Sequence, residues 1–171
     1  SELVYDQSSN YVIQKLCEYL DYSENKSENG TRQSDYSDFD VQFLTFFLSD
    51  IKNVIDHSNS CRVLQKFLEH TTNLDYVDQV LKEIEKSMIN DPTQYINSMC
   101  TSPNGNHIVQ RFIELLPDRI TEIVEIIHPY VSTHVIHSCG CRVVQKLFDC
   151  YDISLLRPLV DEVLTCAADL A

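Results

Sequence analysis

The stretch "GNHIVQRF", residues 105–112, indicates which fold this chain adopts. Its isoleucine, valine and phenylalanine form a stripe that one face of a helix could bury. Asn106 and Gln110 are polar and lie four residues apart, so they stack on one face of the same helix. With His107 beside them, the stretch predicts a helix that presents an amide, a ring and a second amide in a row.

A six-residue string within this stretch recurs along the chain, which indicates a repeat protein. Each copy has Asn or Cys, then Tyr, Arg or His, then two aliphatic residues, then Gln, then Lys or Arg. The copies are NYVIQK at 10–15, CRVLQK at 61–66, NHIVQR at 106–111 and CRVVQK at 141–146. The flanks of the second and fourth copies, 54–70 and 134–150, align without a gap. The interval of 35 residues from Asn106 to Cys141 fits a helical repeat, and the two longer intervals predict insertions.

Length and composition favour a single globular all-α domain. The 171 residues suffice for a sizeable core, and 43% of them are hydrophobic. The chain has three Gly, five Pro and no long alternation of β-branched and polar residues. No stretch is long enough to span a membrane, and the N-terminus has no apolar signal region. The seven cysteines show no disulfide spacing, which suits a reducing compartment.

Each repeat reads as a short helix, a helix that carries the string, and a third, amphipathic helix. In the third repeat these are placed at 94–100, 106–115 and 119–127, between the breaks "TSPNG" and "LPD". In the second repeat, "LDYVDQVLKEIEKSM" predicts a long third helix. Residues 21–40 have almost no aliphatic side chains, so we predict an acidic loop insertion there.

One such repeat cannot bury its apolar face alone, so neighbouring repeats are expected to stack into a solenoid with one helix per repeat on a concave surface. The expected repeats are 1–40, 41–92, 93–128 and 129–165, with 166–171 as the start of a following repeat. We therefore expect the chain to be a fragment of a longer protein.

The charge distribution separates the strings from the rest of the chain. The net charge of −13 argues against a non-specific nucleic-acid binder. The strings nevertheless contain six of the thirteen basic residues and no acidic residue. The sequence thus predicts an acidic protein with one locally basic stripe.

In a stack, equivalent positions of the strings form ladders. The third and fourth positions are expected to enter the core: Val12/Ile13, Val63/Leu64, Ile108/Val109 and Val143/Val144. The first, second and fifth positions are expected to point outward together. The first positions are Asn10, Cys61, Asn106 and Cys141.

The outward ladders have the chemistry of base recognition. The second positions carry flat rings and planar cations, which stack on unpaired bases: Tyr11, Arg62, His107 and Arg142. The fifth positions carry amides, which can bond a Watson–Crick edge: Gln14, Gln65, Gln110 and Gln145. The basic sixth position can meet phosphates.

Plainer interpretations remain for each ladder. The glutamines would then be solvated helix residues, the tyrosine and histidine would pack partly into the core, and the arginines would form surface ion pairs. The cysteines would be small apolar helix residues. "HVIHSCGC" (134–141) has metal-ligand residue types, but its spacing matches no zinc pattern, so we predict no metal site. His57 and His137 follow the first helices of their repeats and are expected to act as caps or to interact with the helix dipole.

The repeated string resembles the recognition motif of the PUF (Pumilio) family of single-stranded RNA-binding proteins. The order Asn-Tyr, Cys-Arg, Asn-His, Cys-Arg resembles the second to fifth repeats of an eight-repeat Pumilio domain. The resemblance implies a right-handed, armadillo-like α-solenoid of three-helix repeats. Ser9 and Ser60 depart from the pattern, because the later repeats have Gly105 and Gly140 at this position.

The resemblance also implies a base code, in which Asn with Gln selects uracil and Cys with Gln selects adenine. With the protein N-terminus facing the RNA 3′ end, the chain would read 5′-A-U-A-U-3′, within UGUANAUA-like elements of messenger 3′ untranslated regions. The readers, in that order, would be Cys141/Gln145, Asn106/Gln110, Cys61/Gln65 and Asn10/Gln14.

The expected function is sequence-specific RNA binding that represses translation or stability of messages in the cytoplasm, with deadenylase and translational-repression factors as further partners. No cofactor, membrane association or enzymatic activity is expected, since no nucleophile–base pair, phosphate loop or carboxylate pair is found. The alternative is a protein-interaction α-solenoid or a ribosome-biogenesis PUF-like scaffold.

Overall fold

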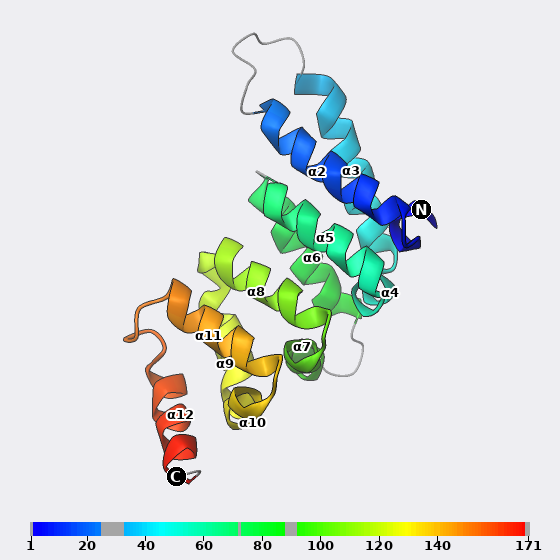
Figure 1. The fold of residues 1–171 in the computed structure, drawn as a ribbon. Helices are drawn as coiled ribbons and strands as arrows, with labels where there is room; N and C mark the ends of the chain where they lie inside the picture. Colours follow the sequence, from blue (N-terminus) through cyan, green and yellow to red (C-terminus); the bar gives the residue numbers. More distant parts are fainter. Residues whose placement is uncertain (1, 25–32, 72, 88–91, 170–171) are drawn as a thin grey trace. The chain divides into compact units, whose positions relative to one another are not determined.

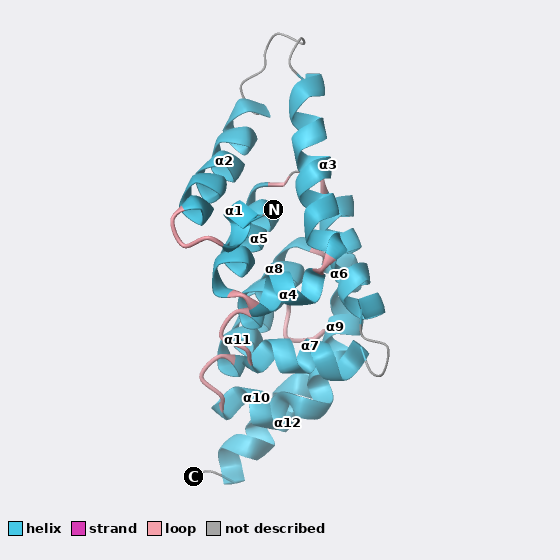
Figure 2. Cartoon of the chain, turned by 90° about the vertical axis from the view of Figure 1, so that its right-hand side faces the viewer, coloured by secondary structure: helices cyan, strands magenta, loops and turns pink. Residues whose placement is uncertain are grey.

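The computed structural model describes residues 2–24, 33–71, 73–87 and 92–169. Within them it places the side chains of residues 2–18, 40–71, 73–87 and 94–168. Every regular element in this part of the chain is a helix (Figures 1 and 2), which confirms the predicted all-α fold. The chain divides into two compact units, Ser1–Ser87 and Met88–Ala171. None of the helices in the described ranges has the length and apolar character needed to cross a membrane.

The first unit is built around the pairing of two helices that each carry a string. Its elements are α1 (Glu2–Tyr5), α2 (Ser9–Glu24), α3 (Gln33–Ser49), α4 (Ile51–Asp56), α5 (Ser58–His70) and α6 (Leu74–Ser87). The helix α2 lies along α5, and α4 contacts both α5 and α6 (Figure 1). Phe47 of α3 is fully buried, with its ring 5.3 Å from that of Phe67 on α5. The third helix of one repeat therefore supplies core to the string helix of the next.

The second unit repeats this arrangement. Its elements are α7 (Pro92–Thr101), α8 (Gly105–Leu115), the 3-10 helix η1 (Pro117–Arg119), α9 (Ile120–Ile127), the 3-10 helix η2 (His128–Tyr130), α10 (Val131–Ile136), α11 (Gly140–Cys150) and α12 (Arg157–Asp169). The two string helices α8 and α11 lie side by side, and the short helices α7 and α10 pack beneath them. Ile108, Ile113 and Leu147 are fully buried in this packing.

The helices predicted for the third repeat and the third helix of the second repeat are confirmed. Those predicted at 94–100, 106–115 and 119–127 correspond to α7, α8 and the η1–α9 pair. Pro117 begins η1, where its missing N–H costs no hydrogen bond. The predicted long helix at 74–88 corresponds to α6 over the described residues.

The prediction of an acidic loop over residues 21–40 is wrong at both ends, because α2 continues to Glu24 and α3 already begins at Gln33. Residues 25–32 lie outside the described part of the chain. The predicted repeat boundary after residue 40 falls inside α3, and the predicted start of a further repeat at 166 falls inside α12. The packed apolar segment 41–48 nucleates the helix α3. Each further residue then adds one main-chain hydrogen bond, so the helix extends into the polar residues before 41.

The aliphatic third and fourth positions enter the core in three of the four strings. The side chains at 63, 64, 108, 109, 143 and 144 are all at most 4% exposed, which confirms the prediction for these strings. The prediction is wrong for Val12, which is 68% exposed, while Ile13 is half-buried. The main contacts of α2 are with α1 and α5, and they leave Val12 exposed to solvent.

A backbone approach at the start of each string helix explains the residue before the string. A Cβ atom on Gly140 would lie 2.7 Å from the carbonyl oxygen of His134, and one on Gly105 would lie 2.9 Å from the Cα of Met99. Ser60 occupies this position in the second repeat, where it is buried and its hydroxyl donates to the carbonyl of Val54 at 2.8 Å. The spacing of α4 and α5 thus admits a side chain that the spacing of α10 and α11 excludes.

We expect Gly140→Ala to lower the free energy of unfolding by about 1–3 kcal/mol, because the added methyl group must push α10 away from α11. Urea unfolding followed by circular dichroism measures the change. The matched control is Ser60→Ala, where a Cβ already fits and only a hydrogen bond of about 1 kcal/mol is lost. A Gly140→Ala protein as stable as the wild type would contradict the close approach.

A buried histidine joins two helices of the second unit. The Nε2 atom of His134 lies 3.0 Å from Oδ1 of Asn97, whose Nδ2 donates to the carbonyl of Ile126. Because this amide directs its oxygen at the ring, Nε2 must carry the proton. Nδ1 of His134 is buried and has no hydrogen-bond partner among the described residues. Burial, with a smaller contribution from the charge of His137, lowers the pKa of His134 below its ordinary value of 6.5.

This lowered pKa predicts a loss of stability in acid. The unfolded chain binds the proton of His134 more tightly than the folded chain, so the folded state is favoured above pH 6.5 and loses stability as pH falls below that value. The slope is at most about 1.4 kcal/mol per pH unit. Denaturant titrations at several pH values should show a shallower slope for His134→Gln. An unchanged slope in that variant would show that other groups are responsible.

Candidate nucleic-acid interface

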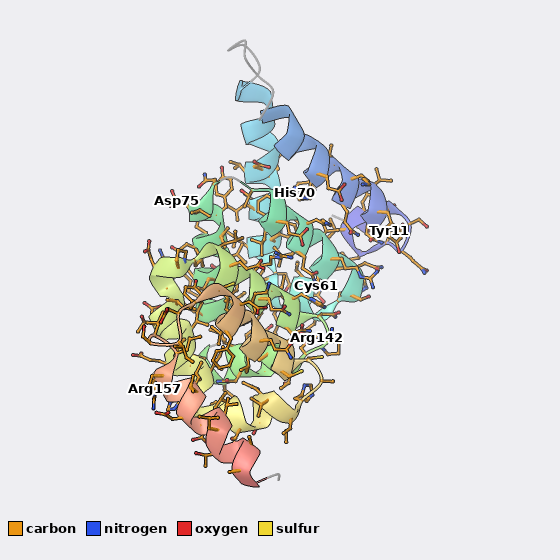
Figure 3. The ribbon with its side chains drawn as sticks, turned by 60° about the vertical axis from the view of Figure 1, so that its left-hand side comes forward. Tyr11, Cys61, His70, Asp75, Arg142 and Arg157 are labelled. Atoms are coloured by element: carbon orange, nitrogen blue, oxygen red, sulfur yellow. The ribbon has the colours of Figure 1, made fainter. Side chains whose placement is uncertain are left out.

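The residues predicted to read bases lie on α2, α5, α8 and α11, which we call the string helices. The first unit brings together the readers on α2 and α5, and the second unit brings together those on α8 and α11. Tyr11, Cys61 and Arg142, labelled in Figure 3, lie on three of these helices. Each unit thus presents two adjacent sets of predicted readers.

The second position of each string faces solvent at least in part. Tyr11 is 59% exposed, Arg62 and Arg142 are exposed, and His107 is half-buried. Within the described part of the chain neither arginine forms an ion pair, so the interpretation that they form surface ion pairs is wrong there. Tyr11 likewise does not pack into the core. These side chains leave flat surfaces open for stacking.

The glutamines at the fifth position are held differently in the two kinds of repeat. Gln14 donates from Nε2 to Oδ1 of Asn10 at 2.7 Å, and Gln110 donates to Oδ1 of Asn106 at 2.9 Å. Gln65 makes the weaker contact of Nε2 with Sγ of Cys61, at 3.4 Å. Gln145 is exposed and makes no side-chain hydrogen bond to a described residue. An Asn at the first position therefore fixes the orientation of the amide that follows it.

The first position does not point outward where it is asparagine, contrary to the prediction. Asn10 and Asn106 are each only 1% exposed. Nδ2 of Asn106 donates to the carbonyls of Ser102 and Pro103 at 2.7 and 3.0 Å, and Nδ2 of Asn10 makes the equivalent pair of bonds in its own repeat. The turn before the helix offers carbonyl oxygens that a buried amide satisfies, which draws the side chain inward.

The cysteines at the first position differ in burial. The prediction that the first position points outward is also wrong for Cys61, which is fully buried. Burial raises the pKa of its thiol to about 11, so it is neutral at physiological pH. Cys141 is half-buried, and its Sγ lies 3.6 Å from the carbonyl of Ser138. Both side chains are shorter than asparagine, so they leave more room beside the following glutamine.

A side-chain acceptor four residues before the first position holds the start of three string helices. Oδ1 of Asp6 accepts from the N–H groups two and three residues later, at 3.0 and 2.7 Å. Oγ of Ser102 and Nδ1 of His137 accept from the equivalent pairs of N–H groups. The predicted capping role is therefore confirmed for His137. His57 makes no such side-chain bond; its ring instead contacts that of Tyr5 at a centroid distance of 5.2 Å.

The basic sixth position is occupied by ion pairs, which the sequence analysis missed. Lys66 pairs with Glu69 at 2.7 Å, and Lys146 pairs with Glu114 at 2.6 Å. Glu114 also pairs with Arg111 of its own helix. The signal was an acidic residue three positions after each basic one: Glu18, Glu69, Glu114 and Asp149. In the free protein these cations are paired with carboxylates, and their contact with phosphates stays a prediction.

The segment 134–141 contributes to packing and capping through its two histidines. His134 is part of the buried pair with Asn97, and His137 caps α11. Within the described ranges, no three His, Cys, Asp or Glu side chains are placed to hold a metal ion.

Each string helix lies in a segment that matches a known family of repeats. A model of the Pumilio-family RNA binding repeat matches residues 1–26, 57–85, 95–128 and 136–164. Pumilio domain-containing protein 6 of Caenorhabditis elegans is 32% identical over 104 residues, which are 58% of this chain and 21% of that protein. Suppressor protein MPT5 of Saccharomyces cerevisiae is 24% identical over 149 residues, which are 85% of this chain and 15% of that protein. This chain thus spans about a fifth or less of the length of these relatives.

Solved structures show the same fold. The Puf4 RNA binding domain bound to the HO endonuclease RNA 3′ UTR recognition sequence matches 99% of this chain and 46% of its own, with a TM-score of 0.71 and 23% identity. The Puf3 RNA binding domain bound to the Cox17 RNA 3′ UTR recognition sequence site B matches 95% of this chain and 39% of its own, with a TM-score of 0.73 and 24% identity. The predicted α-solenoid class of three-helix repeats is confirmed by these matches.

The hydrogen bonds of His137 at the start of α11 allow a test of how much this side chain stabilises the helix. We expect His137→Ala to lower the free energy of unfolding by about 1 kcal/mol, because two N–H groups lose their acceptor. His137→Ser should retain most of the stability, since serine caps α8 at the equivalent Ser102. Thermal unfolding of the two variants measures the difference. Equal stabilities for both variants would show that the ring does not act as a cap.

Proposed function

We propose that this chain, which belongs to the Pumilio family of RNA-binding repeat proteins, binds single-stranded RNA and reads one base with each string helix. The observation that carries the proposal is the repeated pairing of an open stacking group with a glutamine one helical turn away. Tyr11 with Gln14 and Arg142 with Gln145 are the most exposed examples. A base held between such groups is stacked on its face and bonded on its edge.

We infer the base preferences from the first and fifth positions. Asn–Gln pairs, at 10/14 and 106/110, are assigned to uracil, and Cys–Gln pairs, at 61/65 and 141/145, are assigned to adenine. The fixed amide of Gln110 supports a single hydrogen-bonding pattern for its repeat. The small side chain of Cys141 supports a larger base beside Gln145. The second unit then reads 5′-A-U-3′, and the first unit reads the A-U that follows it in the RNA.

The cellular role follows from the same assignment. Several structural neighbours are described as bound to 3′ UTR recognition sequences, which supports a messenger 3′ untranslated region as the target. Binding there would repress translation or stability of the message in the cytoplasm, with deadenylase and repression factors as partners and no catalysis by this chain. The repeated pairing of a stacking group with a glutamine at the same spacing favours this role over a protein-interaction scaffold, which does not require such a repeat.

We expect Arg142→Ala to weaken binding to an RNA that contains AUAU by about 2–30-fold, because a stacked guanidinium contributes about 0.5–2 kcal/mol. Fluorescence anisotropy with a labelled RNA measures this change. The matched control is Arg157→Ala, since this arginine is also exposed but lies on α12, which carries no string.

Single-base changes in the RNA test the reading itself. Replacing the first adenine should weaken binding in the wild type but have little further effect in a Cys141→Ala/Gln145→Ala variant, which has lost the reader for that base. Wild-type binding that is equally tight for AUAU and for all single-base variants would overturn the proposed function.

A further inference from the structure

A carboxylate follows each basic sixth position by three residues on α2, α5 and α8. We call Glu18, Glu69 and Glu114 the carboxylate ladder. Each pairs with the basic residue of its own string: Lys15 with Glu18 at 2.5 Å, Lys66 with Glu69 at 2.7 Å, and Arg111 with Glu114. The spacing of three residues places each pair on one face of its helix.

The ladder also joins neighbouring string helices within each unit. Glu114 of α8 accepts from Nζ of Lys146 on α11 at 2.6 Å, and Glu18 of α2 lies 3.8 Å from Nζ of Lys66 on α5. The same contact therefore occurs in both units, from the acid of one repeat to the base of the next. Because the contact occurs in both units, we infer that it is a regular feature of neighbouring repeats.

Most of these pairs are more enclosed than an exposed surface pair of the described chain, although the side chain of Lys15 is 79% exposed. The side chains of Glu114, Arg111 and Lys146 are 24%, 33% and 26% exposed. Those of Arg157 and Asp161, an ordinary surface pair on α12, are 73% and 57% exposed. An enclosed pair is less screened by solvent and therefore holds its geometry better. In agreement, the hydrogen bond to Glu114 raises the pKa of Lys146.

We propose that the carboxylate ladder keeps the sequence-independent part of the RNA affinity low by holding the sixth-position cations away from RNA phosphates. The inference rests on the proposed function, since it concerns how the same surface rejects RNA of other sequences. A cation on a phosphate strengthens binding to every sequence alike. A cation held by a carboxylate adds nothing to non-specific binding, so the affinity depends on the bases. The ladder pairs with four of the six basic residues in the strings: Lys15, Lys66, Arg111 and Lys146.

The decisive variant is Glu114→Gln, which keeps the size of the side chain and removes the charge that holds Arg111 and Lys146. We expect it to bind both an AUAU-containing RNA and a shuffled RNA more tightly, and by a similar factor, because the released cations contact phosphates of any sequence. Two released cations add about 1.4 to the slope of log affinity against log salt. Between about 50 and 200 mM salt the variant should therefore lose about sevenfold more affinity than the wild type does.

Two further variants control for net charge and for the identity of the released group. Glu122→Gln removes the same charge from α9, where Glu122 pairs with Arg119 away from the string helices, and should leave the salt slope unchanged. Glu114→Gln/Lys146→Gln should return the slope about halfway to the wild-type value. Circular dichroism melts verify that all variants are folded.

The outcomes separate this inference from the proposed function. Wild-type discrimination of AUAU from shuffled RNA, together with an unchanged slope or weaker binding in Glu114→Gln, overturns the inference alone. A wild type that binds the two RNAs equally overturns the proposed function and the inference with it. Equal slopes for Glu114→Gln and Glu122→Gln show a general charge effect and also overturn the inference.

Discussion

Burial of the third and fourth residues in three of the four strings is the constraint on which the proposed reading surface depends. Val63 and Leu64, or Ile108 and Val109, cannot both face the core unless the helix turns its second and fifth residues toward solvent, since each residue advances about 100° around the axis. Side-by-side packing of two string helices in each unit then brings equivalent outward residues next to one another. The spacing of these outward residues within each unit is thus set by apolar packing.

Most of this arrangement could be predicted from sequence because it follows from local periodicity. The helices α7, α8 and α9 were predictable because proline and the "TSPNG" and "LPD" breaks mark their ends and because the apolar residues between them follow the helical period. The helical residues 21–24 and 33–40 could not be predicted, because their composition is typical of a loop. The packed segment that extends α3 lies after residue 40 in the chain. The exposure of Val12 depends on which helices surround α2, and periodicity within one helix carries no such information.

Two features of the site that the sequence analysis did not foresee have a common physical origin. A polar residue in a string was assumed to seek solvent or ligand, whereas Asn10 and Asn106 satisfy main-chain carbonyls, and Arg111 satisfies Glu114. Polar groups at the edge of a core find partners within the protein whenever geometry permits, because an unpaired group there is costly. The acidic residue one turn after the sixth position was visible in the sequence. Its meaning emerged only when both side chains were placed on the same helix face.

The buried asparagines have a consequence for attempts to change the proposed base preference of a repeat. Exchanging Asn106 for cysteine would change the base proposed for this repeat from uracil to adenine. It would also remove the two hydrogen bonds that anchor the preceding turn at Ser102 and Pro103. Cys141 makes one longer contact in their place. Changing the first-position residue of a repeat therefore also changes its folding free energy. An engineered array rich in asparagine at this position would differ in thermal stability from an array rich in cysteine.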